Sequence, residues 1–354
     1  AGDRARVAPD AVIAVQQEAE TRHLVLLRAL HIIPPDNRTW RHRRARSDGR
    51  ASLTPLRAGI RLESIGLDED SYRGFERAWW ARVGVEPREE WLRLARSGPR
   101  LRVQVLGDGP PVVFVPGASN GGTSWASLAA RLPDRRCILL DRPGCGLSEP
   151  LSNGFDDIDA FGAFADDMLV DVLDGLGIER ASIVSTSLGG YFSLRAAAAH
   201  PDRIDAHRPP GLDDRRAGRT PPTGDAAGVD QATGPIDGAR TDTRSRRPSM
   251  LEQLGLRQAL AAGRVPQEFV DWFAAPLRHT DTARNDADAS PPMMHPLRGI
   301  DEKILLADEL LGSIEVPVHF IWGSDDPFGG SDIATDFVPR IPDATLELVD
   351  GGHA

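Results

Sequence analysis

The sequence predicts an α/β fold with a mostly parallel sheet flanked by helices. Two observations lead to this prediction. Apolar runs of β type are each followed by turn residues, and helical periodicity follows most of them; these runs are 111–115, 136–141, 181–185 and 316–322. Strands that alternate with helices in this way form right-handed crossovers and a parallel sheet. Ligands bind such sheets at the carboxyl ends of the strands, so the residues that follow the runs are the candidate site.

Length, composition and charge exclude several classes of protein. With 354 residues, of which 40% are hydrophobic, the chain can fill the core of one large domain or two small ones. A formal net charge of -10 argues against nucleic-acid binding, because phosphate contacts require a basic face. Cys137 and Cys145 lie in no metal-ligand spacing, so a reduced, cytoplasmic setting is expected. The apolar stretch 24–33 is too short to span a membrane, and we see neither a signal peptide nor an anchor.

The first quarter of the chain divides into two parts. Residues 1–70 lack a sustained period, and we interpret them as a poorly ordered extension. They include a basic run at 38–46, for which the alternative interpretation is contact with an anionic surface. From Ser71 to Ala95 apolar residues recur at helical spacing, which predicts one or two helices. The predicted buried set is Phe75, Trp79, Trp80, Val83, Trp91, Leu92 and Ala95.

A hairpin is predicted after these helices. Residues 101–106 alternate between apolar and polar, 107–110 form a turn, and 111–115 read as a buried strand. Amphipathic helices are predicted at 124–132 and at 159–176. The acidic residues of the second helix are interpreted as a solvated face.

Segment 182–190, which reads SIVSTSLGG, is the strongest local signal for chemistry. Its apolar run ends at Ser187, and a helix-forming segment follows the two glycines. A nucleophile elbow requires this context, because its tight turn places a serine at the sheet edge and at the positive end of a helix. Ser185 stands where the usual Gly-x-Ser-x-Gly pattern has its first glycine, so the turn is strained rather than forbidden. The alternative is a plain turn with a buried or capping serine.

Taken in order, Pro116-Gly117-Ala118, Trp125, and the segments 141–148 and 185–190 make the chain resemble the α/β-hydrolase superfamily. The resemblance runs from about residue 100 to 354 and is greatest with bacterial members that carry a cap domain. Family members typically have a His-Gly-x motif, and here Pro116 replaces the histidine. The resemblance implies an oxyanion hole formed by the backbone N–H groups of Ala118 and Leu188.

The resemblance also implies an acid and a histidine that follow the serine in the order Ser, Asp, His. The strand 316–322 precedes Gly323-Ser324-Asp325-Asp326, which is similar to the family's Gly-x-x-Asp loop and selects Asp326. A strand at 346–349 precedes His353, which matches the usual Gly-His position. The alternatives are a turn-forming aspartate and a terminal histidine without a role.

Two departures from the family pattern are visible. A buried strand is expected soon after Ile204, but 205–248 has few large apolar residues, and we interpret it as a disordered insertion. The alternative is a segment out of its ancestral reading frame, which nucleotide resequencing tests by looking for a compensating pair of insertions and deletions. The sequence also ends one residue after His353, so we expect this histidine to lie on a terminus that frays.

The predicted organisation is an α/β-hydrolase core at 71–204 and 313–354, with a helical cap at 249–312 inserted late in the sheet. The implied function is a serine hydrolase, carboxylesterase-like or acting on carbon–carbon bonds, without metal or cofactor. Its small-molecule substrate would react through Ser187, His353 and Asp326 and a covalent acyl-enzyme. The alternatives are a catalytically impaired scaffold or small-ligand binding protein, and a transferase or perhydrolase with the same three residues.

Overall fold

The structure is a computed structural model. It describes residues 66–96, 98–151, 155, 157–205, 251–289, 294–295, 299–300, 306–326 and 329–353. Nearly all of the predicted extension 1–70 and of the predicted insertion 205–248 therefore lies outside the described residues.

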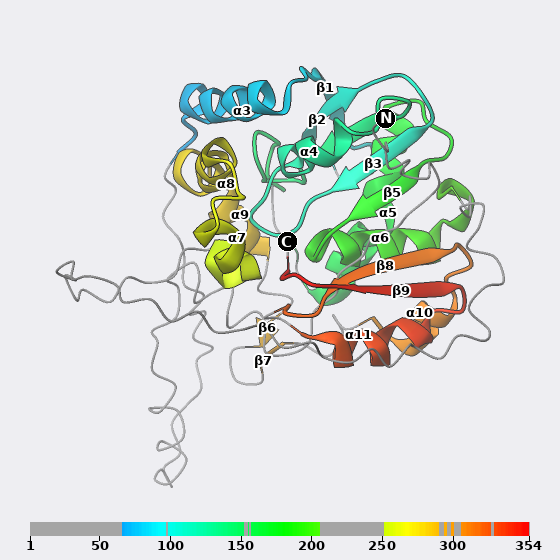
Figure 1. The fold of residues 1–354 in the computed structure, drawn as a ribbon. Coiled ribbons are helices and arrows are strands. Elements are labelled where there is room, and N and C mark those ends of the chain that lie inside the picture. Colours follow the sequence, from blue (N-terminus) through cyan, green and yellow to red (C-terminus); the bar gives the residue numbers. More distant parts are fainter. Residues whose placement is uncertain are drawn as a thin grey trace, which may run out of the picture.

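Within the described residues, a five-stranded sheet has the order β1-β2-β4-β3-β5, and β8 pairs with β9 in a second sheet (Figure 1). β3 is parallel to both β4 and β5, and β8 is parallel to β9, whereas β1 and β2 run antiparallel to their neighbours. The strands are β1 (Arg88–Arg93), β2 (Arg100–Leu106), β3 (Pro111–Val115), β4 (Arg136–Leu140), β5 (Ser182–Ser185), β8 (Val318–Gly323) and β9 (Ala344–Val349). Val113, Ile183 and Phe320 belong to one hydrophobic cluster, so both sheets share a core. The predicted fold class, with a mostly parallel sheet, is confirmed.

Helices flank the sheets, as the alternating pattern predicts. Those of the first part are α3 (Glu69–Val83), η2 (Gly122–Trp125), α4 (Ala126–Ala129), α5 (Ile158–Gly175), α6 (Leu188–Ala199) and η3 (Pro201–Arg203). The segment predicted as a cap contains the π-helix η4 (Glu252–Leu256), α7 (Arg257–Ala261), α8 (Gln267–His279) and α9 (Thr282–Ala289), which we call the cap helices. The short strands β6 (Met294–His295) and β7 (Gly299–Ile300), then α10 (Asp308–Gly312), α11 (Ser331–Phe337) and η7 (Val338–Arg340), complete the described elements.

The helical prediction for 71–95 is right only as far as Val83. Gly84 has a φ of 86°, the left-handed conformation that commonly ends a helix. The chain then forms β1, which pairs with β2. Side chains alternate along a strand, so Leu92 is buried whereas Trp91, predicted to be buried, is 38% exposed.

The predicted hairpin is also wrong in its pairing. Both strands exist, but β4 lies between β2 and β3. After β3 the chain crosses over and adds β4 between β3 and β2. β4 pairs with β2 antiparallel, with Val103 opposite Leu140. Strands with a short connection can therefore lie in the same sheet without pairing.

The chain after α6 begins a further strand pairing. An isolated parallel bridge joins Ala181 to Ile204, and the Asp205 N–H donates to the Ala181 carbonyl at 2.9 Å. The following residues, which were predicted to form no strand, lie outside the described part of the chain.

The cap helices pack against α3 and the five-stranded sheet. Trp79 on α3 lies 5.3 Å from Phe269 on α8, between ring centroids; Trp79 belongs to a second hydrophobic cluster, and Phe269 packs against it. That cluster also contains Phe114 of β3, Val184 of β5 and Leu254 of η4. In Figure 1, α7, α8 and α9 gather on one side of the sheets, towards the carboxyl end of β9. The cap helices thus lie at the edge where the candidate site residues are expected.

Candidate active site

Ser187 stands between β5 and α6 in a backbone conformation that is rare for a residue with a side chain. Its φ is 52° and its ψ is -126°, and its side chain makes no capping hydrogen bond to α6. The Gly190 N–H donates to the Ser187 carbonyl at 2.7 Å, which closes the turn. A Cβ added at Gly189 would lie 2.4 Å from the Val115 carbonyl oxygen, so this position requires glycine. The geometry is that of a strained strand-to-helix turn with the serine at its apex.

The loop after β3 lies directly against this serine. A Cβ added at Gly117 would lie 3.0 Å from the Ser187 Cβ and 3.6 Å from its Oγ. Gly117 therefore lets the backbone of Ala118, one of the two predicted oxyanion donors, approach the serine. The other predicted donor, the N–H of Leu188, is at the first residue of α6, where backbone N–H groups have no partner in their own helix.

Asp326 and His353 come together at the ends of β8 and β9. His353 Nδ1 lies 3.0 Å from Asp326 Oδ2, and the two side chains are 7% and 1% exposed. The loops that carry them are joined by backbone hydrogen bonds, because the Ser324 N–H donates to Val349 at 2.8 Å and the Asp325 N–H donates to Gly351 at 2.9 Å. This pairing leaves Nε2 of the imidazole directed away from the carboxylate.

His353 is also held by the cap helices, contrary to the expectation that it would fray. Its N–H donates to the Leu254 carbonyl in η4 at 2.8 Å. At the same place a Cβ added at Gly352 would lie 2.5 Å from the Gly255 Cα, so two backbones approach closely. The Leu254 side chain packs in the cluster that contains Val184, three residues before Ser187. Leu254 thus connects the histidine to the strand that carries the serine.

An ion pair between the buried Arg142 and the partly buried Asp286 supports the loop after β3. Arg142 donates from Nε to the Pro116 carbonyl at 3.1 Å and from Nη2 to the Gly117 carbonyl at 2.8 Å. Its guanidinium pairs with Asp286 on α9 at 3.3 Å. Burial opposes the charged form of Arg142, but the nearby Asp286 carboxylate outweighs burial, and the pKa of Arg142 lies above its usual value. Arg142 therefore stays charged at neutral pH.

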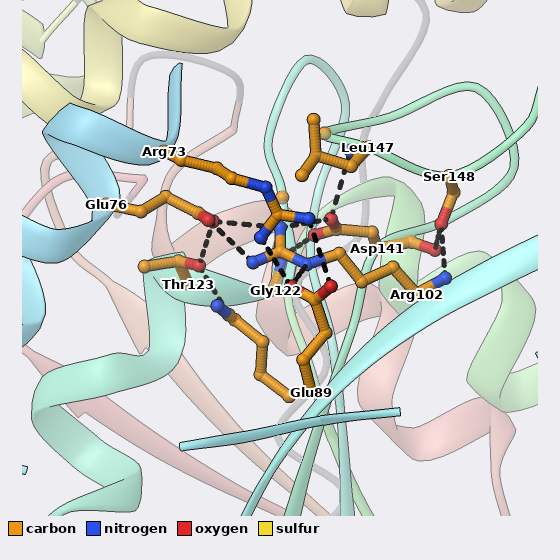
Figure 2. A network of polar contacts seen from close by, with 12 residues as sticks. Arg73, Glu76, Glu89, Arg102, Gly122, Thr123, Asp141, Leu147 and Ser148 are labelled. Carbon is orange, nitrogen blue, oxygen red and sulfur yellow. Dashed lines mark hydrogen bonds and ion pairs between the residues drawn. The ribbon is translucent and has the colours of Figure 1, made fainter. Parts of the chain in front are cut away.

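A second network of polar contacts, drawn in Figure 2, joins β2 to α3 and to the loops that follow β3 and β4. Arg102 on β2 is 1% exposed and pairs with Glu76 at 2.6 Å, Glu89 at 2.7 Å and Asp141 at 3.1 Å. Asp141 in turn accepts hydrogen bonds from the Gly122 N–H at 2.7 Å and the Leu147 N–H at 3.2 Å. Burial raises the pKa of Asp141. One carboxylate thus ties together the two loops that follow β3 and β4.

Similar proteins cover most of this chain. A family model described as the alpha/beta hydrolase fold matches residues 110–207. RutD of Caulobacter sp. (strain K31), assigned as a carbamate hydrolase, is 36% identical over 261 residues, which are 70% of this chain and 84% of that protein. The chain belongs to the α/β-hydrolase family.

Other members of the α/β-hydrolase family differ in their named substrates. A 2-hydroxy-6-oxononadienedioate/2-hydroxy-6-oxononatrienedioate hydrolase of Cupriavidus pinatubonensis (strain JMP 134 / LMG 1197) is 25% identical over 250 residues, 68% of this chain and 80% of that protein. Among solved structures, naproxen esterase of Bacillus subtilis is similar with a TM-score of 0.55 and 20% identity, over 80% of this chain and 90% of that one. The solved structure supports the fold alone.

The sequence of this α/β hydrolase alone did not indicate the roles of Arg142, Asp286 and Arg102. Asp286 lies in a helix of mostly polar residues, and Arg102 alternates with apolar residues in its strand, so both patterns indicate solvent exposure. Within the described ranges, no helix is long and apolar enough to cross a bilayer. The same ranges contain no cluster of three or more His, Cys, Asp or Glu residues suited to a metal ion.

Proposed function

We propose that this α/β hydrolase cleaves an ester-like or related bond of a small molecule, with Ser187 as nucleophile, His353 as base and Asp326 as the acid that orients it. The observation that carries the proposal is the backbone conformation of Ser187. A serine that only caps a helix has a negative φ and bonds its side chain to the first turn, whereas Ser187 has a φ of 52° and no such bond. The strained turn is explained if it presents the hydroxyl to a substrate.

The proposed mechanism assigns one role to each group. His353 takes the proton from the Ser187 hydroxyl through Nε2 as the oxygen attacks the substrate carbonyl, and Asp326 stabilises the resulting imidazolium. The N–H groups of Ala118 and Leu188 stabilise the negative charge that develops on the carbonyl oxygen. His353 then protonates the leaving group, and water activated by the same imidazole hydrolyses the acyl-enzyme.

Burial of the acid–base pair supports this assignment. The contact of His353 Nδ1 with Asp326 at 3.0 Å fixes the ring and favours the tautomer in which Nε2 accepts a proton. The cap helices, which we propose as the cap domain of this hydrolase, hold the backbone of the same histidine. The impaired scaffold is the less favoured alternative, because His353 is buried and is fixed at both its backbone and its ring.

A fluorophosphonate probe tests the proposal, because it labels serines that an adjacent base activates. The full chain should be labelled at Ser187 with a stoichiometry near one, as located by peptide mass spectrometry, and Ser187→Ala should not be labelled. Ser193→Ala is the matched control, since Ser193 is a buried serine of α6 whose hydroxyl donates to the Gly189 carbonyl at 2.9 Å. It should be labelled as the unaltered protein is.

The outcomes distinguish a hydrolase from an impaired scaffold and from a transferase or perhydrolase. Absence of labelling in a protein with a cooperative unfolding transition would favour the impaired scaffold and reject the proposal. If labelling succeeds, p-nitrophenyl acetate and a 2-hydroxy-6-oxo-dienoate separate ester from carbon–carbon bond cleavage. Capture of the acetyl group by added alcohol or hydrogen peroxide in preference to water would indicate a transferase or a perhydrolase instead.

A further inference from the structure

Arg142 donates hydrogen bonds to two backbone carbonyl groups of the loop that follows β3. Its Nη2 donates to the Gly117 carbonyl at 2.8 Å and its Nε donates to the Pro116 carbonyl at 3.1 Å. The residue is 3% exposed, so water does not compete for these contacts. Two carbonyl groups of consecutive residues are therefore directed to one guanidinium plane.

The Gly117 carbonyl belongs to the same peptide unit as the Ala118 N–H. In a planar trans peptide, the C=O and N–H groups point in opposite directions. A donor that holds the Gly117 carbonyl on one side therefore turns the Ala118 N–H to the other side. If this peptide rotated by half a turn, a carbonyl oxygen would stand where the substrate's oxyanion needs a donor.

Asp286 fixes the guanidinium in turn. Its carboxylate lies 3.3 Å from Arg142, accepts a hydrogen bond from the Ser119 N–H, and lies 3.5 Å from the Cys145 sulfur. Asp286 is located on α9, while its partners lie in the loops that follow β3 and β4. A cap helix thus contacts the loop of the oxyanion donor directly and through Arg142.

We propose that Arg142 and Asp286 are positioning residues that set the orientation of the Gly117–Ala118 peptide, so that α9 supports the oxyanion hole. This proposal rests on the proposed function of Ser187 for its catalytic consequence. Its structural content, that the ion pair fixes the loop 116–119, stands independently of the substrate and of the reaction.

Two variants weaken the ion pair without removing bulk. Asp286→Asn keeps a carbonyl oxygen for the Ser119 N–H but loses the negative charge that holds Arg142. Arg142→Lys keeps the positive charge, but a single ammonium lacks the planar fork that reaches both carbonyls and the carboxylate. Loss of one oxyanion donor lowers turnover by about 100- to 1000-fold, so we expect its misorientation to cost about 10- to 100-fold.

The matched control is Asp166→Asn. Asp166 on α5 pairs with Arg195 on α6 at 2.8 Å, and it lies in a part-buried ion pair outside the loops of the candidate site. The same chemical change at this position removes a comparable charge pair. Asp166→Asn should leave the labelling rate of Ser187 unchanged.

Labelling kinetics test the catalytic consequence. The rate constant for fluorophosphonate labelling is measured against probe concentration for the full chain and each variant. Asp286→Asn and Arg142→Lys should lower the maximal rate constant by about 10- to 100-fold, with an unchanged half-saturating concentration. Equal maximal rates in the unaltered protein and both variants would overturn the proposal while the proposed function stands.

Hydrogen exchange tests the structural content without any reaction. Backbone amides of Gly117, Ala118 and Ser119 should exchange at least several-fold faster in Asp286→Asn than in the unaltered protein and in Asp166→Asn. If the unaltered protein is not labelled at all, the proposed function fails and this measurement still decides. Unchanged exchange in a folded Asp286→Asn variant would then overturn the proposal.

Discussion

Two sides of the candidate site are held in place by different forces. The loops 116–122 and 141–148, which we call the oxyanion side, are fixed by charged side chains that are buried or partly buried, namely Arg142, Asp286, Arg102 and Asp141. The loops 323–326 and 350–353, which we call the base side, are fixed by backbone hydrogen bonds and by close backbone approaches at glycines. Loss of one of these charges should therefore loosen the first side, and a methyl group at Gly352 should displace the second.

This difference follows from what surrounds each pair of loops. On the oxyanion side, Glu76 on α3 pairs with Arg102 in β2. Asp286 on α9 pairs with Arg142, which follows β4. The low local dielectric strengthens both contacts. On the base side, Gly323 and Gly352 lie so close that a Cβ at Gly323 would be 2.3 Å from the Gly352 carbonyl oxygen. Little space remains there for positioning by longer side chains.

The largest expected effect is on stability, from Arg102→Met. This change leaves Glu76 and Asp141 buried without their shared cation, which costs about 3–5 kcal/mol of the free energy of unfolding. Arg88→Met is the matched control, because Arg88 forms an exposed pair with Asp108 at 3.1 Å. Its expected effect is below about 1 kcal/mol. Urea unfolding measures both, and equal midpoints for the two variants would contradict the role given to buried charge.

The base side should respond to a single methyl group. A Cβ at Gly352 would lie 2.4 Å from the Leu254 carbonyl oxygen, so Gly352→Ala must displace either η4 or His353. A displacement of about 1 Å can lower a catalytic rate about 100-fold, and we expect a loss of this size in the labelling rate of Ser187.

Gly351→Ala is the control for this prediction. A Cβ at Gly351 has no atom within 4 Å among the described residues, and we expect a labelling rate close to that of the unaltered protein. If Gly352→Ala and Gly351→Ala label at the same rate, the close approach of η4 does not position His353.

The smallest expected effect is a pH dependence of stability that arises from the charges of the oxyanion side. Partial burial raises the pKa of Glu89, but the hydrogen bond from Arg73 and the charge of Arg102 outweigh it and lower the pKa to about 2. Because the folded-state pKa is below the unfolded one, this stabilisation is present above about pH 4.5 and is lost as the pH falls towards 2.

Unfolding by urea at several pH values measures this contribution. We expect the unaltered protein to lose about 1–2 kcal/mol more than Glu89→Gln between pH 5 and pH 2. Parallel acid limbs for the two proteins would show that Glu89 contributes no titrating stability. Such a result would weaken the conclusion that charged side chains hold the oxyanion side. It would not affect the conclusion that backbone contacts hold the base side.

Much of the fold was predictable because local patterns carry it. The apolar runs at 111–115 and 136–141 became the buried strands β3 and β4, and the small residues around Ser187 predicted the tight turn before α6. The roles of Ser187, Asp326 and His353 remain proposals, but the turn after the strand and the order of the segments were visible in the sequence.

The remaining features depend on contacts between distant parts of the chain. Which strand pairs with β2 depends on the crossover between β3 and β4, and the turn at 107–110 does not encode that crossover. Burial of Arg102 depends on Glu76, 26 residues away, and the position of Asp286 depends on Arg142, 144 residues away. A charged residue in an alternating strand or a polar helix gives no local sign of such a partner.

Attachment of the cap helices at Leu254 and at Asp286 has a consequence for protein engineering and for divergence within the family. If the cap helices form the substrate-facing surface, as proposed, a chimera that receives them from a relative would also exchange two contacts that support the proposed reacting groups. Changes of specificity and changes of rate are then genetically linked. Successful transplants should be those that carry over, or re-evolve, a carboxylate opposite Arg142 and a close backbone contact beside His353.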